Sequence, residues 1–149
     1  MSLTTSVLRL VIDASLGIWL GKMVFFSFVA APKTFKVLER GRAGDVVNEI
    51  FPTYYLVGIV AGVVTFVAGV ALGALTDYNL SLGVVLGGAA VGAGIDVYAR
   101  QVLIPRIKGN DSSRDDGDED AFEQYHGLSV KLNAVALIVV SASLVASHF

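Results

Sequence analysis

The chain has 149 residues, of which 54% are hydrophobic and only 16% are charged, and its mean hydropathy is +0.69. These values lie outside the range of soluble domains, so we expect an integral membrane protein. The net charge is −2 with no basic face for nucleic acid, and the absence of cysteine excludes disulfides, thiolate metal ligands and a cysteine nucleophile.

Four apolar runs each approach the roughly 20 residues that cross a hydrocarbon core of about 30 Å. They lie at about residues 7–31, 52–75, 80–104 and 124–147. Only the short stretch TDYNLS separates the second and third runs, which predicts an antiparallel helical hairpin there. The sequence therefore predicts one all-α domain over residues 1–149, an antiparallel up-down four-helix bundle embedded in membrane lipid.

Two longer connections join the other runs. Residues 33–50 begin as a short amphipathic segment, break at Gly41 and Gly44, and restart with Asp45 as a helix N-cap. Residues 108–121 form a polar, acidic loop. The opposite side of the predicted bundle has Arg9 alone, whereas basic residues gather beside these two connections. They are Lys33, Lys36, Arg40, Arg42, Arg106, Lys108 and Arg114. The positive-inside rule predicts a multi-pass protein of the plasma membrane, with both long loops cytoplasmic and both termini outside.

Glycine pairs at GxxxG spacing recur along the first three runs. Small residues at this spacing let helix backbones approach closely, which favours association in lipid. We expect these pairs to pack helices within the chain, and Gly58/Gly62 or Gly83/Gly87 could alternatively form a homo-oligomer contact. The pairs are Gly17/Gly21, Gly58/Gly62, Gly69/Gly73, Gly83/Gly87 and Gly88/Gly92.

Two charged residues stand inside apolar runs at similar depth. Lys22 precedes Pro32 by about 15 Å of helix, and Asp96 precedes Pro105 by about 14 Å. The first and third runs are parallel in the predicted topology, so both side chains reach the same level. An ammonium near mid-membrane is costly unless it is paired or hydrated, which predicts that Lys22 pairs with Asp96.

Further polar groups fall in the same cytoplasmic half of the bundle. Arg100 shares a helical face with Asp96. The fourth run carries a polar stripe, and the second run opens at Pro52 with two tyrosines. These groups predict a polar pocket that opens inward, and a purely structural network that fixes helix register is the alternative. The stripe consists of Glu123, His126, Ser129 and Asn133, and the tyrosines are Tyr54 and Tyr55.

Four segments together resemble a known family. They are GKMVFFSFVAAPKTF, IFPTYYLVG, RQVLIPRI and FEQYHGLSVKLN. In this order they are similar to the family named after transmembrane protein 205, whose bacterial and archaeal members are classed as domain of unknown function 4149. The resemblance covers nearly the whole chain and implies four membrane helices, with transport or drug and metal resistance suggested for relatives.

Cofactor chemistry finds little support in the sequence. His126 and His148 would lie about 33 Å apart along one helix, so they cannot hold one haem. Glu123 with His126 supplies only half of the motif set of a di-iron bundle. No metal site, catalytic residue or cofactor is therefore predicted.

Two functional hypotheses remain open. The first is a small permease or export accessory in which the polar pocket binds an ion or small solute, because ionisable groups inside membranes are functional candidates. The second is a membrane enzyme, or a protein binding a cofactor, lipid or quinone, that uses His126 and Glu123. The sequence favours the first hypothesis over an enzyme.

Overall fold

The computed structural model describes the backbone of residues 2–111 and 119–149 and the side chains of residues 2–107 and 124–149. All regular structure within these residues is helical, without a strand. Of the predicted acidic loop at residues 108–121, residues 112–118 lie outside the described residues, and so do the side chains of Lys108, Arg114 and Glu123. The elements are α1 (Leu3–Phe25), η1 (Phe26–Ala30), α2 (Ala31–Val37), α3 (Arg40–Thr76), α4 (Leu80–Tyr98), η2 (Ala99–Leu103), α5 (Ile104–Asp111) and α6 (Glu119–Ala146). The two ends of the predicted loop are helical, because α5 continues to Asp111 and α6 begins at Glu119.

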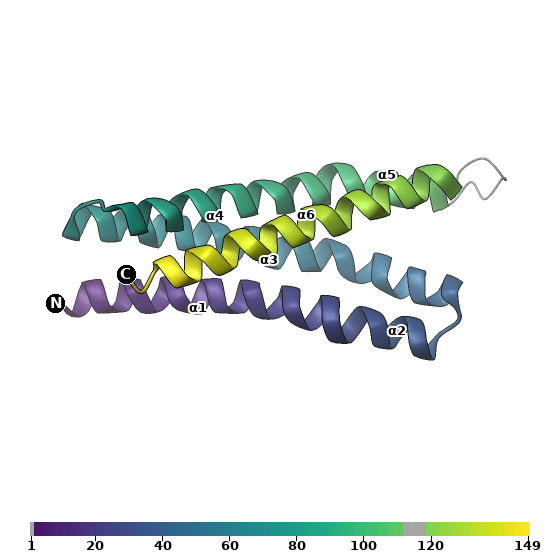
Figure 1. Cartoon of the computed structure of the whole chain (residues 1–149), viewed down its shortest axis with the longest axis horizontal. Helices are drawn as coiled ribbons and strands as arrows, with labels where there is room; N and C mark the ends of the chain where they lie inside the picture. The colour runs from purple at the N-terminus through teal and green to yellow at the C-terminus, as the bar shows by residue number, and fades with distance from the viewer. Residues whose placement is uncertain (1, 112–118) are drawn as a thin grey trace.

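Four helical stretches are long and apolar enough to cross a membrane, as a multi-pass membrane protein requires. They are Leu3–Val37, Arg40–Thr76, Leu80–Ile107 and Gln124–Ala146. Figure 1 shows these stretches running along the long axis of the molecule, with both termini and the turn at residues 77–79 at one end. We call this the terminal end, and the opposite end, with the turn at residues 38–39, the loop end.

Short polar residues set the helix boundaries at the terminal end. The Ser2 hydroxyl accepts a hydrogen bond from the Thr5 amide, and Asn79 Oδ1 accepts one from the Leu82 amide at 2.8 Å. Both contacts satisfy amides that have no partner within their own helix. Asp77 has a positive φ of 77°, which reverses the chain between α3 and α4.

Two π-helical segments interrupt the first and third long stretches. η1 and η2 each end two residues before a proline, Pro32 and Pro105. Proline lacks an amide hydrogen and its ring clashes with the preceding turn, which accounts for the wider winding there. The first helical stretch therefore continues through Pro32 to Val37, beyond the predicted span at residues 7–31.

The connection before the second span differs from its sequence prediction. α3 begins at Arg40, with Glu39 in the N-cap position, so the predicted N-cap at Asp45 is wrong. Gly41 lies within this helix rather than at a break, and Pro52 lies inside it rather than at its start. Hydropathy had located the apolar part of the helix, whereas the helix itself includes a polar first section.

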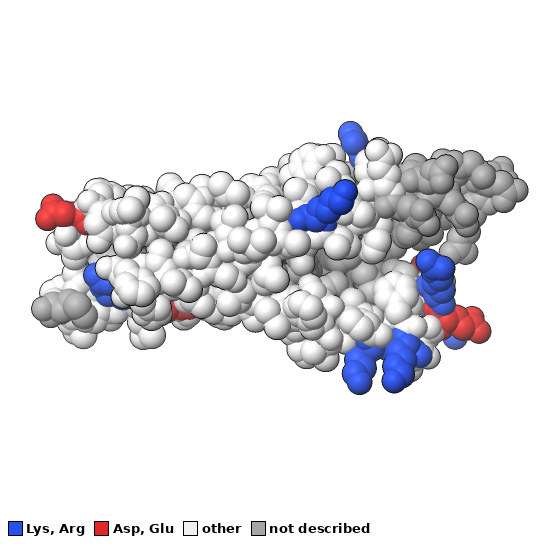
Figure 2. All heavy atoms as spheres, in the orientation of Figure 1, with Lys and Arg blue, Asp and Glu red and all other residues white. Residues whose placement is uncertain are grey.

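The core lies along the axis between the four stretches and contains fully buried side chains such as Leu16, Trp19 and Val140. α3 packs against α1 and α4, and α6 packs against α4 and α1. Large apolar side chains also cover the outside, for example Leu10 and Ile138, which are 67% and 69% exposed. Figure 2 shows a broad uncharged surface over the half towards the terminal end, as expected for a surface that faces lipid.

GxxxG spacing alone does not identify the close helix contacts. A Cβ added at Gly62 would lie 2.8 Å from the Cβ of Ala93, and one added at Gly92 would lie 2.7 Å from the Trp19 ring. By contrast, a Cβ at Gly83 or Gly87 would meet nothing within 4 Å. Equal spacing therefore occurs on packed and on open helix faces.

Candidate functional site

An ion pair between α1 and α4 forms the centre of the candidate site. Lys22 Nζ lies 3.4 Å from Asp96 Oδ2, and their side chains are 12% and 3% exposed. The two residues are 74 positions apart in the chain. The structure thus brings together the two charges whose pairing was predicted from their depth along the first and third spans.

Both charged groups have additional polar partners. Trp19 Nε1 donates a hydrogen bond to Asp96 Oδ2 at 3.0 Å, and Lys22 Nζ donates one to the Tyr54 carbonyl at 2.7 Å. The Lys22 ammonium also lies 3.8 Å from the centroid of the Tyr54 ring. These contacts replace part of the hydration that each ion loses on burial, which makes the pair tolerable inside the bundle.

Gly58 on α3 leaves the space that the ion pair occupies. A Cβ added at this position would collide with Asp96 Oδ2 and would lie 2.6 Å from Lys22 Nζ. A residue with a side chain would therefore displace one of the two charged groups. Gly58 allows the α3 backbone to approach the ion pair directly.

The fourth long stretch joins the site through a second set of hydrogen bonds. The Tyr54 hydroxyl donates to Asn133 Oδ1 at 2.7 Å, and Asn133 Nδ2 donates to Ser27 Oγ at 3.2 Å. Tyr55 packs edge-on against Tyr54 with ring centroids 5.2 Å apart. Polar groups from all four stretches therefore meet in one network, which we call the Lys22–Asp96 network.

The remaining predicted site residues differ in their exposure. Arg100 and His126 are exposed. Ser129 is buried, but its hydroxyl donates to the His126 carbonyl within its own helix at 2.8 Å. The Glu123 side chain lies outside the described residues. Of the predicted polar stripe, Asn133 is the member that contacts Tyr54.

Sequence reasoning missed three contributors to the site. Trp19 is the single tryptophan of the chain, and it lies one turn from Lys22 on the same helix. A buried indole N–H needs a hydrogen-bond acceptor, so the position of Trp19 could have predicted its hydrogen bond to Asp96. Gly58 had been considered only as half of a glycine pair, and Ser27 carries no signal beyond its hydroxyl.

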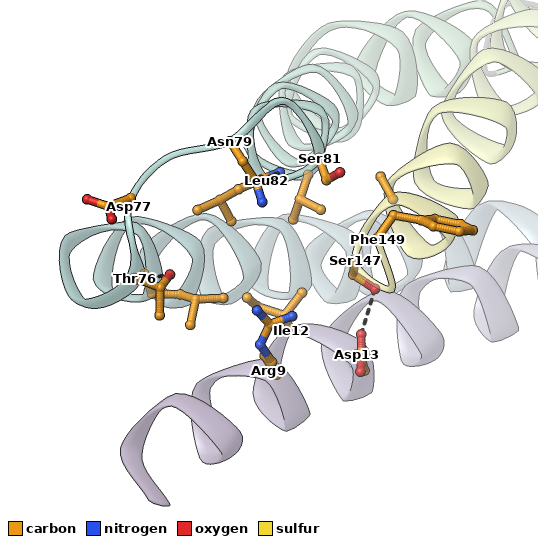
Figure 3. Close-up of a pocket in the computed structure, with 13 residues that line it drawn as sticks. Arg9, Ile12, Asp13, Thr76, Asp77, Asn79, Ser81, Leu82, Ser147 and Phe149 are labelled. Atoms are coloured by element: carbon orange, nitrogen blue, oxygen red, sulfur yellow. Dashed lines mark hydrogen bonds between the residues drawn. The ribbon is translucent and has the colours of Figure 1, made fainter. Parts of the chain in front are cut away.

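A separate cavity of about 50 Å³ lies at the terminal end. Figure 3 shows Arg9 reaching from α1 towards α3, whereas Asp77 points away from the cavity. The Ser147 hydroxyl donates a hydrogen bond to Asp13 Oδ1 at 2.7 Å. Leu72 and Val85 also line this cavity. It lies at the end of the bundle opposite to the predicted inward pocket.

The polar groups of the site limit which ligands it can bind. Among the described side chains, no group of three His, Asp or Glu residues lies close enough together to hold a metal ion. The Lys22–Asp96 network instead offers one ammonium, one carboxylate and neutral hydroxyl and amide groups. Such a set can exchange a proton or bind a small polar species.

Comparison with known proteins places the chain in a family. The model of the family described as domain of unknown function (DUF4149) matches residues 14–115, more than half of the chain. The chain belongs to this family. The narrower resemblance to transmembrane protein 205 stays a prediction.

A similar protein comes from Aquifex aeolicus (strain VF5) and is described as uncharacterized. The two are 33% identical over 126 residues, which cover 85% of this chain and 86% of that protein. No solved structure matches the chain. The match to the family includes Lys22, Tyr54, Gly58 and Asp96 but ends before Asn133.

Proposed function

We propose that this DUF4149 protein is a small permease or export accessory in which the Lys22–Asp96 network binds an ion or small polar solute. In this proposal the four stretches form an antiparallel up-down bundle in the plasma membrane, with the loop end in the cytoplasm and both termini outside. The basic residues beside the loop end support this orientation. A homo-oligomer contact through the open face at Gly83 and Gly87 belongs to the same proposal.

The buried ion pair carries the proposal. A pair in a low-dielectric interior loses much of its hydration, so packed apolar residues of similar volume often give equal or greater stability. Asp96 is 3% exposed and Lys22 is 12% exposed, within a bundle whose outer surface is apolar. Ionisable residues in this position are by default candidates for ion or proton pathways.

The enzymatic or cofactor-binding alternative has less support from the geometry. It assigned the chemistry to His126 and Glu123 on α6. His126 is exposed, and its backbone carbonyl accepts the hydrogen bond of Ser129. The Glu123 side chain lies outside the described residues. This alternative predicts that a chromophore, lipid or quinone copurifies with the protein and that no solute flux occurs.

Flux measurements in proteoliposomes test the proposal. Purified protein is reconstituted into vesicles, and the uptake of protons, of monovalent cations and of small amines is followed with dyes or isotopes. The variants Asp96→Asn and Lys22→Gln remove one charge each. The matched controls Asp45→Asn and Lys131→Gln remove the same charges from exposed positions.

The expected result is flux of one solute that falls at least about tenfold in Asp96→Asn and Lys22→Gln and is unchanged in both controls. Each variant should be monodisperse in detergent before reconstitution, so that misfolding does not imitate loss of transport. Equal flux in all variants, or no flux above protein-free vesicles, would contradict the proposal.

A further inference from the structure

One buried hydroxyl in the half of the bundle towards the terminal end has no hydrogen-bond partner among the described residues. It belongs to Thr65, which is 0% exposed. Threonine in a helix can bond a carbonyl of the preceding turn, as Thr76 does to Leu72. A buried hydroxyl that no protein group satisfies is a candidate partner for a buried water molecule.

The position of Thr65 relates it to both polar sites of the molecule. Gly58, Thr65 and Leu72 follow one another at seven-residue intervals along α3, so they share one helix face. Gly58 contacts the ion pair, and Leu72 lines the cavity at the terminal end. Thr65 therefore lies midway, about 10 Å along the axis from each.

The helix register supplies a second hydroxyl at the same level. A Cβ at Gly58 would meet Lys22, and one at Gly62 would meet Trp19. Residue numbers on α1 therefore decrease in the direction in which residue numbers on α3 increase. Seven residues from Lys22 on the same face of α1 is Ser15, which this register places opposite Thr65. Ser15 is 9% exposed.

The surroundings of these two hydroxyls are otherwise apolar. The corresponding register on α4, from Gly62 against Ala93 and Gly69 against Leu86, places Ala89 near the level of Thr65. Leu16 and Ala89 are both 0% exposed. Such walls hold few waters at rest, so a polar midpoint is needed for any water chain through this half.

We infer that Thr65 and Ser15 bind a water molecule that is the midpoint of a transient water chain, and that the solute carried by the Lys22–Asp96 network is the proton. A span of about 10 Å on each side corresponds to roughly three waters at ordinary hydrogen-bond distances. The chain connects the cavity beside Arg9 and Asp13 with Asp96.

The transfer step changes only O–H bonds. A proton arriving from the cavity binds the water at Thr65, and a different proton of that water passes along the chain to the Asp96 carboxylate. The water is regenerated, and one proton has moved across half of the bundle. The inference rests on the proposed function and deepens it, because it names the transported species and its route.

Isosteric substitution of Thr65 tests the relay. Thr65→Val keeps the volume and removes the hydroxyl, whereas Thr65→Ser keeps the hydroxyl. Thr34→Val is the matched control, because the Thr34 hydroxyl donates to the Ala30 carbonyl, one turn earlier in the same long stretch, at 2.8 Å. Proteoliposomes with a pH-sensitive dye inside report proton flux after a potassium-driven potential is applied, with Asp96→Asn measured in parallel.

Proton flux should fall about tenfold in Thr65→Val, remain within about twofold of wild type in Thr65→Ser, and be unchanged in Thr34→Val. Thr65→Val breaks no hydrogen bond between described protein groups, so its thermal stability should stay close to that of the wild type. A fall in flux with unchanged stability therefore reports the relay and not the fold.

Three results would overturn the inference, and they separate it from the proposed function. Normal proton flux in Thr65→Val with reduced flux in Asp96→Asn would contradict the water relay but would still support the transport site at Asp96. Flux of another ion that depends on Asp96, without proton flux, would show that the proton is not the transported species but would still support the transport site. The absence of any flux that depends on Asp96 would contradict both the water relay and the proposed transport function.

Discussion

The two halves of the bundle differ in how they treat buried polar groups. Towards the loop end, Lys22, Asp96, Tyr54 and Asn133 bond to partners on other helices. In the half towards the terminal end, the Thr65 hydroxyl has no partner among the described residues. Bonds between helices there come from two serine hydroxyls, that of Ser143 to the Val84 carbonyl at 3.5 Å and that of Ser147 to Asp13 Oδ1 at 2.7 Å. Apolar side chains such as Leu16 are fully buried there.

This difference indicates which half of the bundle fixes the register between the helices. Hydrogen bonds between helices fix which residues face one another, whereas packing of alanine, leucine and valine tolerates small shifts. The half with the Lys22–Asp96 network should therefore determine the helix register, and the other half should tolerate substitution. Stability measurements on variants from each half can break or sharpen this comparison.

The largest effect is expected from separating the ion pair. Lys22→Met leaves the Asp96 carboxylate buried without its cation, which should reduce the free energy of unfolding by about 3–5 kcal/mol. Equilibrium unfolding in mixed micelles measures this change. The double variant Lys22→Met/Asp96→Leu removes both charges and should recover most of the loss. Additive losses in the double variant would show that the two residues are not coupled.

A smaller effect is expected at Gly58. Gly58→Ala places a methyl group against Asp96 Oδ2 and Lys22 Nζ, and this overpacking should cost about 1–3 kcal/mol. The control Gly87→Ala meets nothing within 4 Å, and it should be neutral or stabilising by up to about 1 kcal/mol because alanine favours helix. Equal losses at both positions would mean that glycine acts only through helix propensity.

The sequence predicted the part of the site that depends on depth alone. The spacing of Lys22 from Pro32 and of Asp96 from Pro105 gave nearly equal levels, and a charge in an apolar run needs a partner. The number of apolar helices followed from run length in the same way. These predictions depend on one helix at a time and on the thickness of the hydrocarbon.

Contacts between helices were harder to predict. Periodicity assigned His126 and Asn133 to one stripe, but they are about 10 Å apart along α6, and only Asn133 contacts Tyr54. Gly58 and Gly87 belong to equivalent GxxxG pairs in the sequence, yet only Gly58 meets a neighbour. Periodicity identifies a helix face, whereas the neighbour of that face depends on the rotation of every helix.

Helix ends were predicted poorly for a related reason. The apolar run indicated a start near Pro52, whereas α3 begins twelve residues earlier at Arg40. The added section carries Arg42, Asp45 and Glu49, which lower its hydropathy, and of these Arg and Glu are good helix formers. Val47 is 6% exposed, so this polar section still contributes to the packed interior.

The smallest effect should come from the hydrogen bond that links α3 to α6. Tyr54→Phe removes the hydroxyl that donates to Asn133 Oδ1, and bonds between membrane helices contribute only about 1 kcal/mol because the unfolded chain in lipid also finds partners. Unfolding of Tyr54→Phe, Asn133→Ala and the double variant gives the coupling free energy directly. Tyr98→Phe is the control, since Tyr98 is 41% exposed. A coupling energy near zero would mean that α6 is positioned by packing alone, and the Lys22–Asp96 network would then fix the register of α1, α3 and α4 but not that of α6.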